Sequence, residues 1–63
     1  MSDRFQRFAA KVHTQDEFER LTDDEVEVLK GRRKHSPVAV AIKMHRSEST
    51  IHRLQRSIIE KIG

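Results

Sequence analysis

The stretch SPVAVAIKMHRSESTIHRL, residues 36–54, decides the fold because it holds two helix starts close together. Ser36 followed by Pro37 is typical of a helix N-cap and its first position, where proline's missing N–H would be unpaired in any case. The helical pattern halts just before Ser47, which provides a second N-cap. The sequence therefore predicts two helices joined by about three residues.

The second of these helices carries a continuous apolar stripe at offsets of 0, 3, 7 and 11, the spacing of one buried helical face. Its members are Ile51, Leu54, Ile58 and Ile62. Gly63 follows as the expected C′ residue. In the first helix Val38, Ala41 and Ile42 keep helical spacing, and Val40 and Met44 lie on an adjoining stripe. The small Ala41 allows a close crossing, so the pair predicts a helix-turn-helix whose long second helix is the recognition helix.

Two more helices are expected upstream. Thr22 and Glu25 have the spacing of a capping box, and Leu21 and Val26 match a hydrophobic staple, so a helix starts at Thr22 and runs to about residue 33. Its inner face is expected to hold Val26, Val28 and Leu29. A helix from about residue 3 to 13 follows from Ser2 as N-cap and from apolar residues at helical spacing, namely Phe5, Phe8, Ala9 and Val12. A second capping-box pattern at Thr14 predicts only a short turn or a helical extension.

The 63 residues thus predict an all-α, four-helix domain, with an N-terminal helix and connection over 1–20 and the helix-turn-helix region over 21–63. Charge is divided unevenly along this chain. Residues 1–31 carry a net charge of −3 and residues 32–63 carry +6. A basic half of this size indicates a polyanionic partner, of which nucleic acid is the most common.

Residues 21–63 resemble the LuxR-type (GerE-like) DNA-binding domain of bacterial transcription regulators, through LTDDEVEVLK, SPVAVAIKMHRSESTIHRL and the closing IIEKIG. The resemblance implies a helix-turn-helix that binds double-stranded DNA in a small bacterial or phage transcriptional regulator. Bacterial sigma factor region 4 shares much of this pattern. His45 stands where the family commonly has glycine and Arg46 where it has an apolar residue, so we expect a less regular turn. The family's further dimerisation helix lies beyond residue 63, so its dimer mode is not carried over and a homodimer is left open.

The outward positions of the last helix have the chemistry to read DNA. Arginine pairs with guanine in the major groove, glutamate accepts from cytosine N4, and serine or histidine bonds to bases or phosphates. The expected base-reading residues are Glu48, Ser49, His52, Arg53 and Arg56. The expected phosphate contacts, at helix starts and in the basic connection, are Arg32, Arg33, Lys34, Ser36, Lys43, Arg46, Ser47 and Thr50.

The sequence is also compatible with functions other than DNA binding. The acidic segment 14–27 fits helix-terminus electrostatics, and also a contact with RNA polymerase or another transcription protein. A protein-interaction module with weak or no DNA binding, and an oligomerisation domain that uses the isoleucine stripe, are therefore the alternatives.

Several classes are excluded. With no Cys there is no disulfide framework and no thiolate zinc site, and the spacing of His45, Glu48 and His52 is too weak to predict a metal. So small a chain has no room for a deep catalytic cleft, and no spacing sets a nucleophile against a base. We expect no enzyme and no cofactor. The longest apolar stretch, residues 38–42, is too short for a membrane span or a signal peptide, so the expected location is the cytoplasm.

Overall fold

The computed structural model describes residues 3–63, and all regular structure within that range is α-helical. The helices are α1 (Arg4–Lys11), α2 (Gln15–Glu19), α3 (Asp23–Arg32), α4 (Pro37–Met44) and α5 (Glu48–Ile62). The predicted all-α class is confirmed. The predicted number of four helices is wrong, because the segment after Thr14 forms a separate short helix rather than a turn or an extension.

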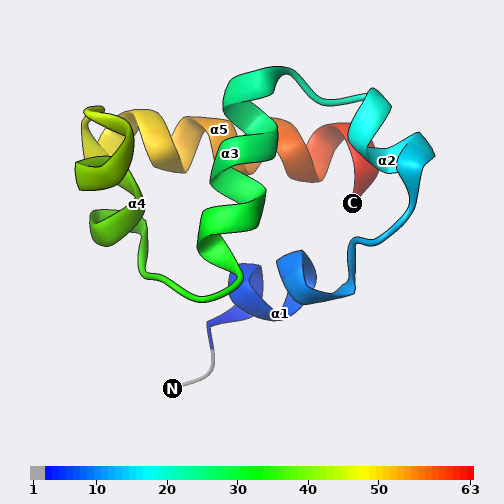
Figure 1. The fold of residues 1–63 in the computed structure, drawn as a ribbon, viewed down its shortest axis with the longest axis horizontal. Helices are drawn as coiled ribbons and strands as arrows, with labels where there is room; N and C mark the ends of the chain where they lie inside the picture. Colours follow the sequence, from blue (N-terminus) through cyan, green and yellow to red (C-terminus); the bar gives the residue numbers. More distant parts are fainter. Residues whose placement is uncertain (1–2) are drawn as a thin grey trace.

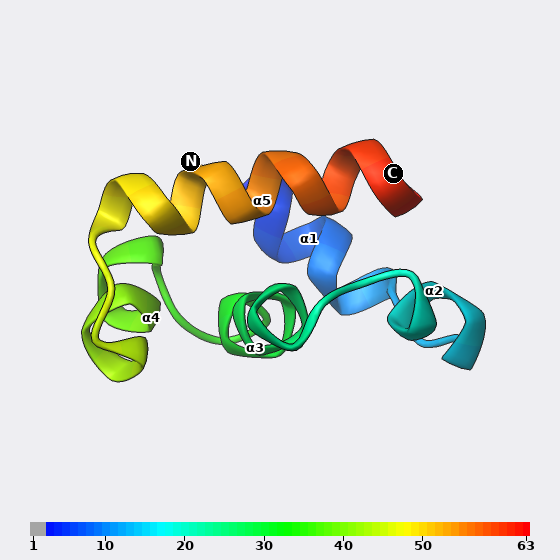
Figure 2. The same ribbon diagram turned by 90° about the horizontal axis from the view of Figure 1, so that it is seen from above.

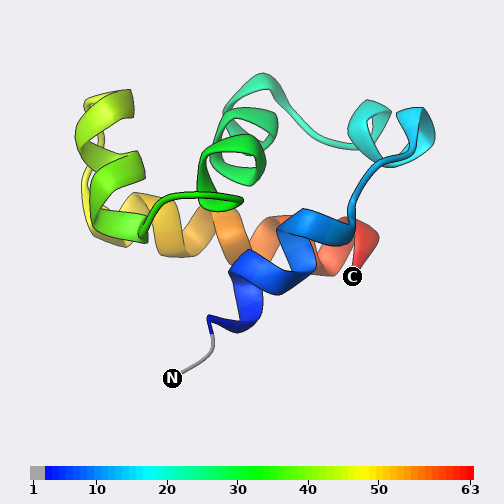
Figure 3. The same ribbon diagram turned by 60° about the horizontal axis from the view of Figure 1, so that its bottom comes forward.

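The long helix α5 organises the molecule. Helix α3 crosses it near its middle, and α4 lies beside its N-terminal half (Figure 1). Seen from above, α5 forms one layer, α3 and α4 form a second, and α1 closes the side between them (Figure 2). Figure 3 shows α1 in front of α5, with α2 beyond the end of α1. The core at the junction of these helices consists of Phe5, Ala9, Val12, Val28, Leu29, Val40, Ala41, Ile51 and Ile58.

Helix starts follow the capping residues that the sequence displays. The side chains of Thr14, Thr22, Ser36 and Ser47 each accept a hydrogen bond from the backbone N–H three residues on, and the first two form complete capping boxes. Helix α1 is capped by Asp3, whose Oδ1 accepts from Gln6 N at 3.0 Å. The expected cap, Ser2, lies outside the described residues.

Helix α4 turns a different face inward than expected. Val40 and Ala41 are buried and Met44 is half-buried, as predicted, whereas Val38 is 49% exposed and Ile42 71% exposed. The reason is that α4 packs against both α3 and α5 through Val40 and Ala41. Helix α4 approaches α3 so closely that a Cβ atom added at Gly31 would lie 3.0 Å from Val40 Cγ2. The side chains at 38 and 42 then point away from both neighbours.

Helix α3 also has a different inner face. Val28 and Leu29 are fully buried, Val26 is only half-buried, and two charged residues, Glu25 and Arg32, take the remaining inward positions. The predicted place of Val26 in the core is therefore wrong. One turn of α3 separates each charged residue from the buried pair, so all four side chains lie on one face.

The connection between α4 and α5 is a regular turn. His45 has φ 57° and ψ 42°, the left-handed conformation usually supplied by glycine. Arg46 N donates to Ala41 O at 2.9 Å and His45 N donates to Ile42 O at 3.2 Å, which is the hydrogen-bond pattern of a Schellman motif. The expected irregularity is absent, because His45 adopts the left-handed backbone conformation in which glycine is common.

Candidate nucleic-acid interface

The exposed face of α5 carries all five predicted base-reading residues. Glu48, Ser49, His52, Arg53 and Arg56 are all exposed. The opposite face of the same helix is held in the core by residues 51 and 58, which have no exposed surface. This division follows from the sequence, because a 15-residue helix with an apolar stripe must direct its remaining positions outward.

Contacts within this face are few and weak. His52 Nε2 lies 3.4 Å from Glu48 Oε2, and its Nδ1 lies 3.5 Å from Gln55 Nε2. Among the described residues, Arg53 and Arg56 form no ion pair. Together with His52 they line a shallow depression of about 390 Å³. Both guanidinium groups are therefore available to a partner.

Four predicted phosphate contacts lie near the starts of α4 and α5. Ser36 and Ser47 are exposed N-caps, and the Ser47 hydroxyl lies 2.9 Å from that of the half-buried Thr50. Arg46 in the turn is half-exposed and lies 3.4 Å from Asp24 at the start of α3. An exposed pair at this distance is weak, so the guanidinium of Arg46 stays accessible from outside the molecule.

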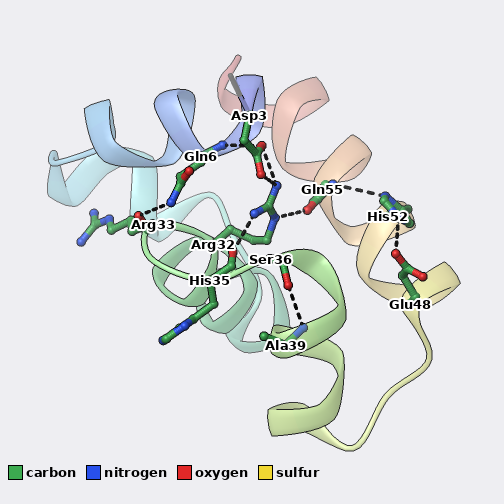
Figure 4. A network of polar contacts seen from close by, with 10 residues as sticks. All are labelled: Asp3, Gln6, Arg32, Arg33, His35, Ser36, Ala39, Glu48, His52 and Gln55. Atoms are coloured by element: carbon green, nitrogen blue, oxygen red, sulfur yellow. Dashed lines mark hydrogen bonds and ion pairs between the residues drawn. The ribbon is translucent and has the colours of Figure 1, made fainter. Parts of the chain in front are cut away.

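Arg32 is not a surface residue, and its expected role as a phosphate contact is wrong. Its guanidinium lies in the interior, where Nη2 donates to both carboxylate oxygens of Asp3 at 2.7 and 2.6 Å (Figure 4). Nη1 donates to His35 O at 2.7 Å, and Nε donates to Gln55 Oε1 at 2.6 Å. Arg32 thus ties α1, the α3–α4 connection and α5 together. The hydrogen bond from Arg32 is the main reason why the pKa of Asp3 lies below its usual value.

Arg33 serves a similar purpose on the other side of the connection. It is half-buried, and its guanidinium donates to Ala9 O at 3.1 Å and to Val12 O at 2.5 Å, which closes the C-terminal end of α1. Figure 4 shows Arg33 and His35 directed to the side of the molecule opposite Glu48 and His52. The basic connection is therefore not part of the α5 face.

The remaining predicted phosphate contacts, Lys34 and Lys43, line a groove between α3 and α4 of about 510 Å³. Lys30 and His35 line the same groove and were not predicted. Lys30 lies in the last turn of α3 and Lys34 in the turn that follows it, so the short distance between them in the chain was the signal available in the sequence.

The acidic segment is only partly available to a partner. Asp16, Glu19, Asp23, Asp24 and Glu27 are exposed, whereas Glu25 is 2% exposed. Glu25 Oε1 accepts from Thr22 N at 2.8 Å and from Lys61 Nζ at 2.6 Å. Burial raises the pKa of Glu25, but hydrogen bonds to the carboxylate, foremost from Lys61, outweigh it and lower the pKa to about 2.

Within residues 3–63, no group of three or more His, Cys, Asp or Glu side chains is arranged to hold a metal ion. No helix in the described part of the chain has the length and apolar character needed to cross a membrane. Comparison of the chain with family models, with curated proteins and with solved structures finds no match.

Proposed function

We propose that α4 and α5 act as a helix-turn-helix that binds double-stranded DNA with α5 in the major groove, as in a small transcriptional regulator. The observation that carries this proposal is the exposure of all five polar residues on one face of a helix whose other face is fixed in the core. A rigid helix with free arginines is the usual element for reading base edges. The three-residue connection between Met44 and Glu48 supports the same assignment.

Each residue of the α5 face has a role under this proposal. Arg53 and Arg56 pair with guanine, and Glu48 accepts from a cytosine amino group. Ser49 and His52 bond to neighbouring bases or phosphates, and His52 becomes free to do so by leaving its 3.4 Å contact with Glu48. The shallow depression lined by the two arginines and His52 then faces the floor of the DNA major groove.

Phosphate contacts flank this face. The backbone N–H groups at the starts of α4 and α5 favour anions, and Ser36 and Ser47 mark those two starts. Arg46 and Thr50 lie beside the second start and add side-chain donors. These contacts set the orientation of α5 on the duplex, while the residues of its exposed face supply the sequence preference.

The test is a selection of bound duplexes from a random pool, followed by mobility-shift titrations of a selected and a shuffled duplex at two salt concentrations. We expect tighter binding to the selected duplex, and weaker binding to both as salt rises. A palindromic selected site would mean that two copies bind together, with half-sites about one helical turn apart. No binding to any duplex at low salt would refute the proposal.

A protein-interaction module is the second candidate, and one observation favours it. Val38 and Ile42, one helical turn apart on α4, are 49% and 71% exposed and form a small apolar surface that a partner protein could cover. The exposed carboxylates of segment 14–27, such as Asp23 and Glu27, would add a contact to a basic transcription protein. This candidate predicts that Ile42→Ser abolishes binding to that protein while binding to duplex DNA, if present, is unchanged.

A further inference from the structure

The groove between α3 and α4 concentrates more free positive charge than the α5 face. Three exposed lysines line it, namely Lys30, Lys34 and Lys43, against one carboxylate, Glu27, while the guanidinium of Arg33 at its edge is engaged with the C-terminal end of α1. The exposed face of α5 carries two arginines against one glutamate. The three groove lysines are exposed, and none of them forms an ion pair with a described residue. Their ammonium groups are thus open to an external anion.

This groove is a separate surface from the α5 face. Its α3 residues do not belong to the helix face that packs on α5, which holds Val28, Leu29 and the Arg32 that bonds to Gln55. His35 and Arg33, at the edge of the groove, point away from Glu48 and His52 (Figure 4). The groove that Lys30, Lys34 and Lys43 line together with Arg33 and His35 is therefore a different surface from the one on which a single straight duplex would lie along α5.

We propose that the α3–α4 groove binds the phosphate backbone of a second nucleic-acid duplex. Lysine ammonium groups act as point charges that neutralise phosphates without reading bases. The floor of the groove supports this assignment, because Gly31, Val40 and Met44 offer no side-chain donors or acceptors of the kind that recognise a base. The groove thus binds duplex of any sequence, and the chain has two DNA contacts on different faces.

The experiment compares three sets of charge-neutralising variants in the full chain. The groove set is Lys30→Gln, Lys34→Gln and Lys43→Gln together. The α5 set is Arg53→Gln with Arg56→Gln. The matched control removes three exposed cations from α1, through Arg4→Gln, Arg7→Gln and Lys11→Gln. Circular dichroism establishes that each protein is folded before binding is measured.

The first readout is the salt dependence of binding to a random 20-base-pair duplex, which is measured by fluorescence anisotropy. The α5 set is expected to retain salt-dependent binding through the groove. Adding the groove set to it is expected to flatten the slope of log K against log salt by about 2 to 3, since each lost phosphate contact removes about 0.9. Adding the α1 control set instead should leave that slope nearly unchanged.

The second readout is capture of a fluorescent duplex by an immobilised duplex, which requires both faces. The wild-type protein is expected to bridge the two duplexes, and the groove set is expected to reduce capture at least tenfold while retaining preference for the selected site. Undiminished bridging by the groove set would overturn the inference, since a dimer joined elsewhere would then hold the two duplexes. Nuclear magnetic resonance of the lysine side chains provides a further check. If the signals of the groove lysines shift with inorganic pyrophosphate but not with duplex, the groove binds a small phosphorylated ligand and the proposed duplex contact is overturned. Loss of site preference in the α5 set tests the proposed function separately.

Discussion

Replacing Glu25 with glutamine tests the buried ion pair between α3 and α5. Glutamine keeps the shape of the side chain and its place in the capping box with Thr22, but it loses the charge that attracts Lys61. The pKa of Glu25 is about 2, against an ordinary value of 4.5. A difference of roughly 2.5 units at about 1.36 kcal/mol each corresponds to about 3 kcal/mol of folding free energy.

The lowered pKa of Glu25 determines how its contribution to stability depends on pH. Because the folded-state pKa is below the unfolded-state pKa, the stabilisation is fully present above about pH 5 and is lost as the pH falls toward 2. This stabilisation is measured by urea unfolding at low temperature, monitored by circular dichroism, at a series of pH values between 7 and 2.5. The free energy of unfolding of the wild type minus that of Glu25→Gln should fall by about 2.5 kcal/mol over this range, because at pH 2.5 the carboxyl group of Glu25 is still mostly ionised in the folded state.

Glu17 provides the matched control, since it is also the third residue of a capping-box helix but lacks a buried partner. Glu17→Gln should leave most of the acid sensitivity in place. A carbon-13 titration of the Glu25 carboxyl group in the wild type measures its pKa without any mutation. A difference between wild type and Glu25→Gln that stays constant from pH 7 to pH 2.5, or a Glu25 titration midpoint near 4.5, would refute the reasoning.

Three further predictions concern single positions. His45→Gly should raise stability by about 0.5 to 1 kcal/mol, because glycine adopts the left-handed conformation without strain, and thermal unfolding measures this gain. Arg32→Met should lower stability by about 3 to 5 kcal/mol and leave the chain largely unfolded by circular dichroism, whereas a true surface phosphate contact would tolerate the change. Ile42→Ala should change the urea midpoint little, within about 0.5 kcal/mol, while Val40→Ala costs about 2 kcal/mol. Equal losses at 40 and 42 would contradict the observed orientation of α4.

Local signals in the sequence predicted the helix starts well. Thr22, Ser36 and Ser47 each accept a hydrogen bond from a backbone N–H three residues further on, so this capping depends only on residues that are close together in the sequence. The alternation of buried and exposed positions on α5 was equally readable, because only one stripe of that helix is apolar.

Positions that depend on distant contacts were harder to predict. All five residues from 38 to 42 are apolar, so no polar side chain marks an outward face. Periodicity alone therefore does not select Val40 over Ile42 as the inward residue. The contact with Gly31 selects it. Arg32 was predicted to lie on the surface because it is followed by two further basic residues. Its partners Asp3 and Gln55, which hold it in the interior, lie 29 and 23 residues away in the chain.

Substitution of Arg53 is the sharpest test of the proposal that the exposed face of α5 reads DNA sequence. Fluorescence anisotropy gives the Kd of the wild type and of Arg53→Gln for the selected duplex and for a shuffled duplex of the same composition. If Arg53 pairs with a base, Arg53→Gln should weaken binding to the selected duplex by about 5- to 150-fold and to the shuffled duplex by much less. Equal weakening on both duplexes, or none on either, would contradict it.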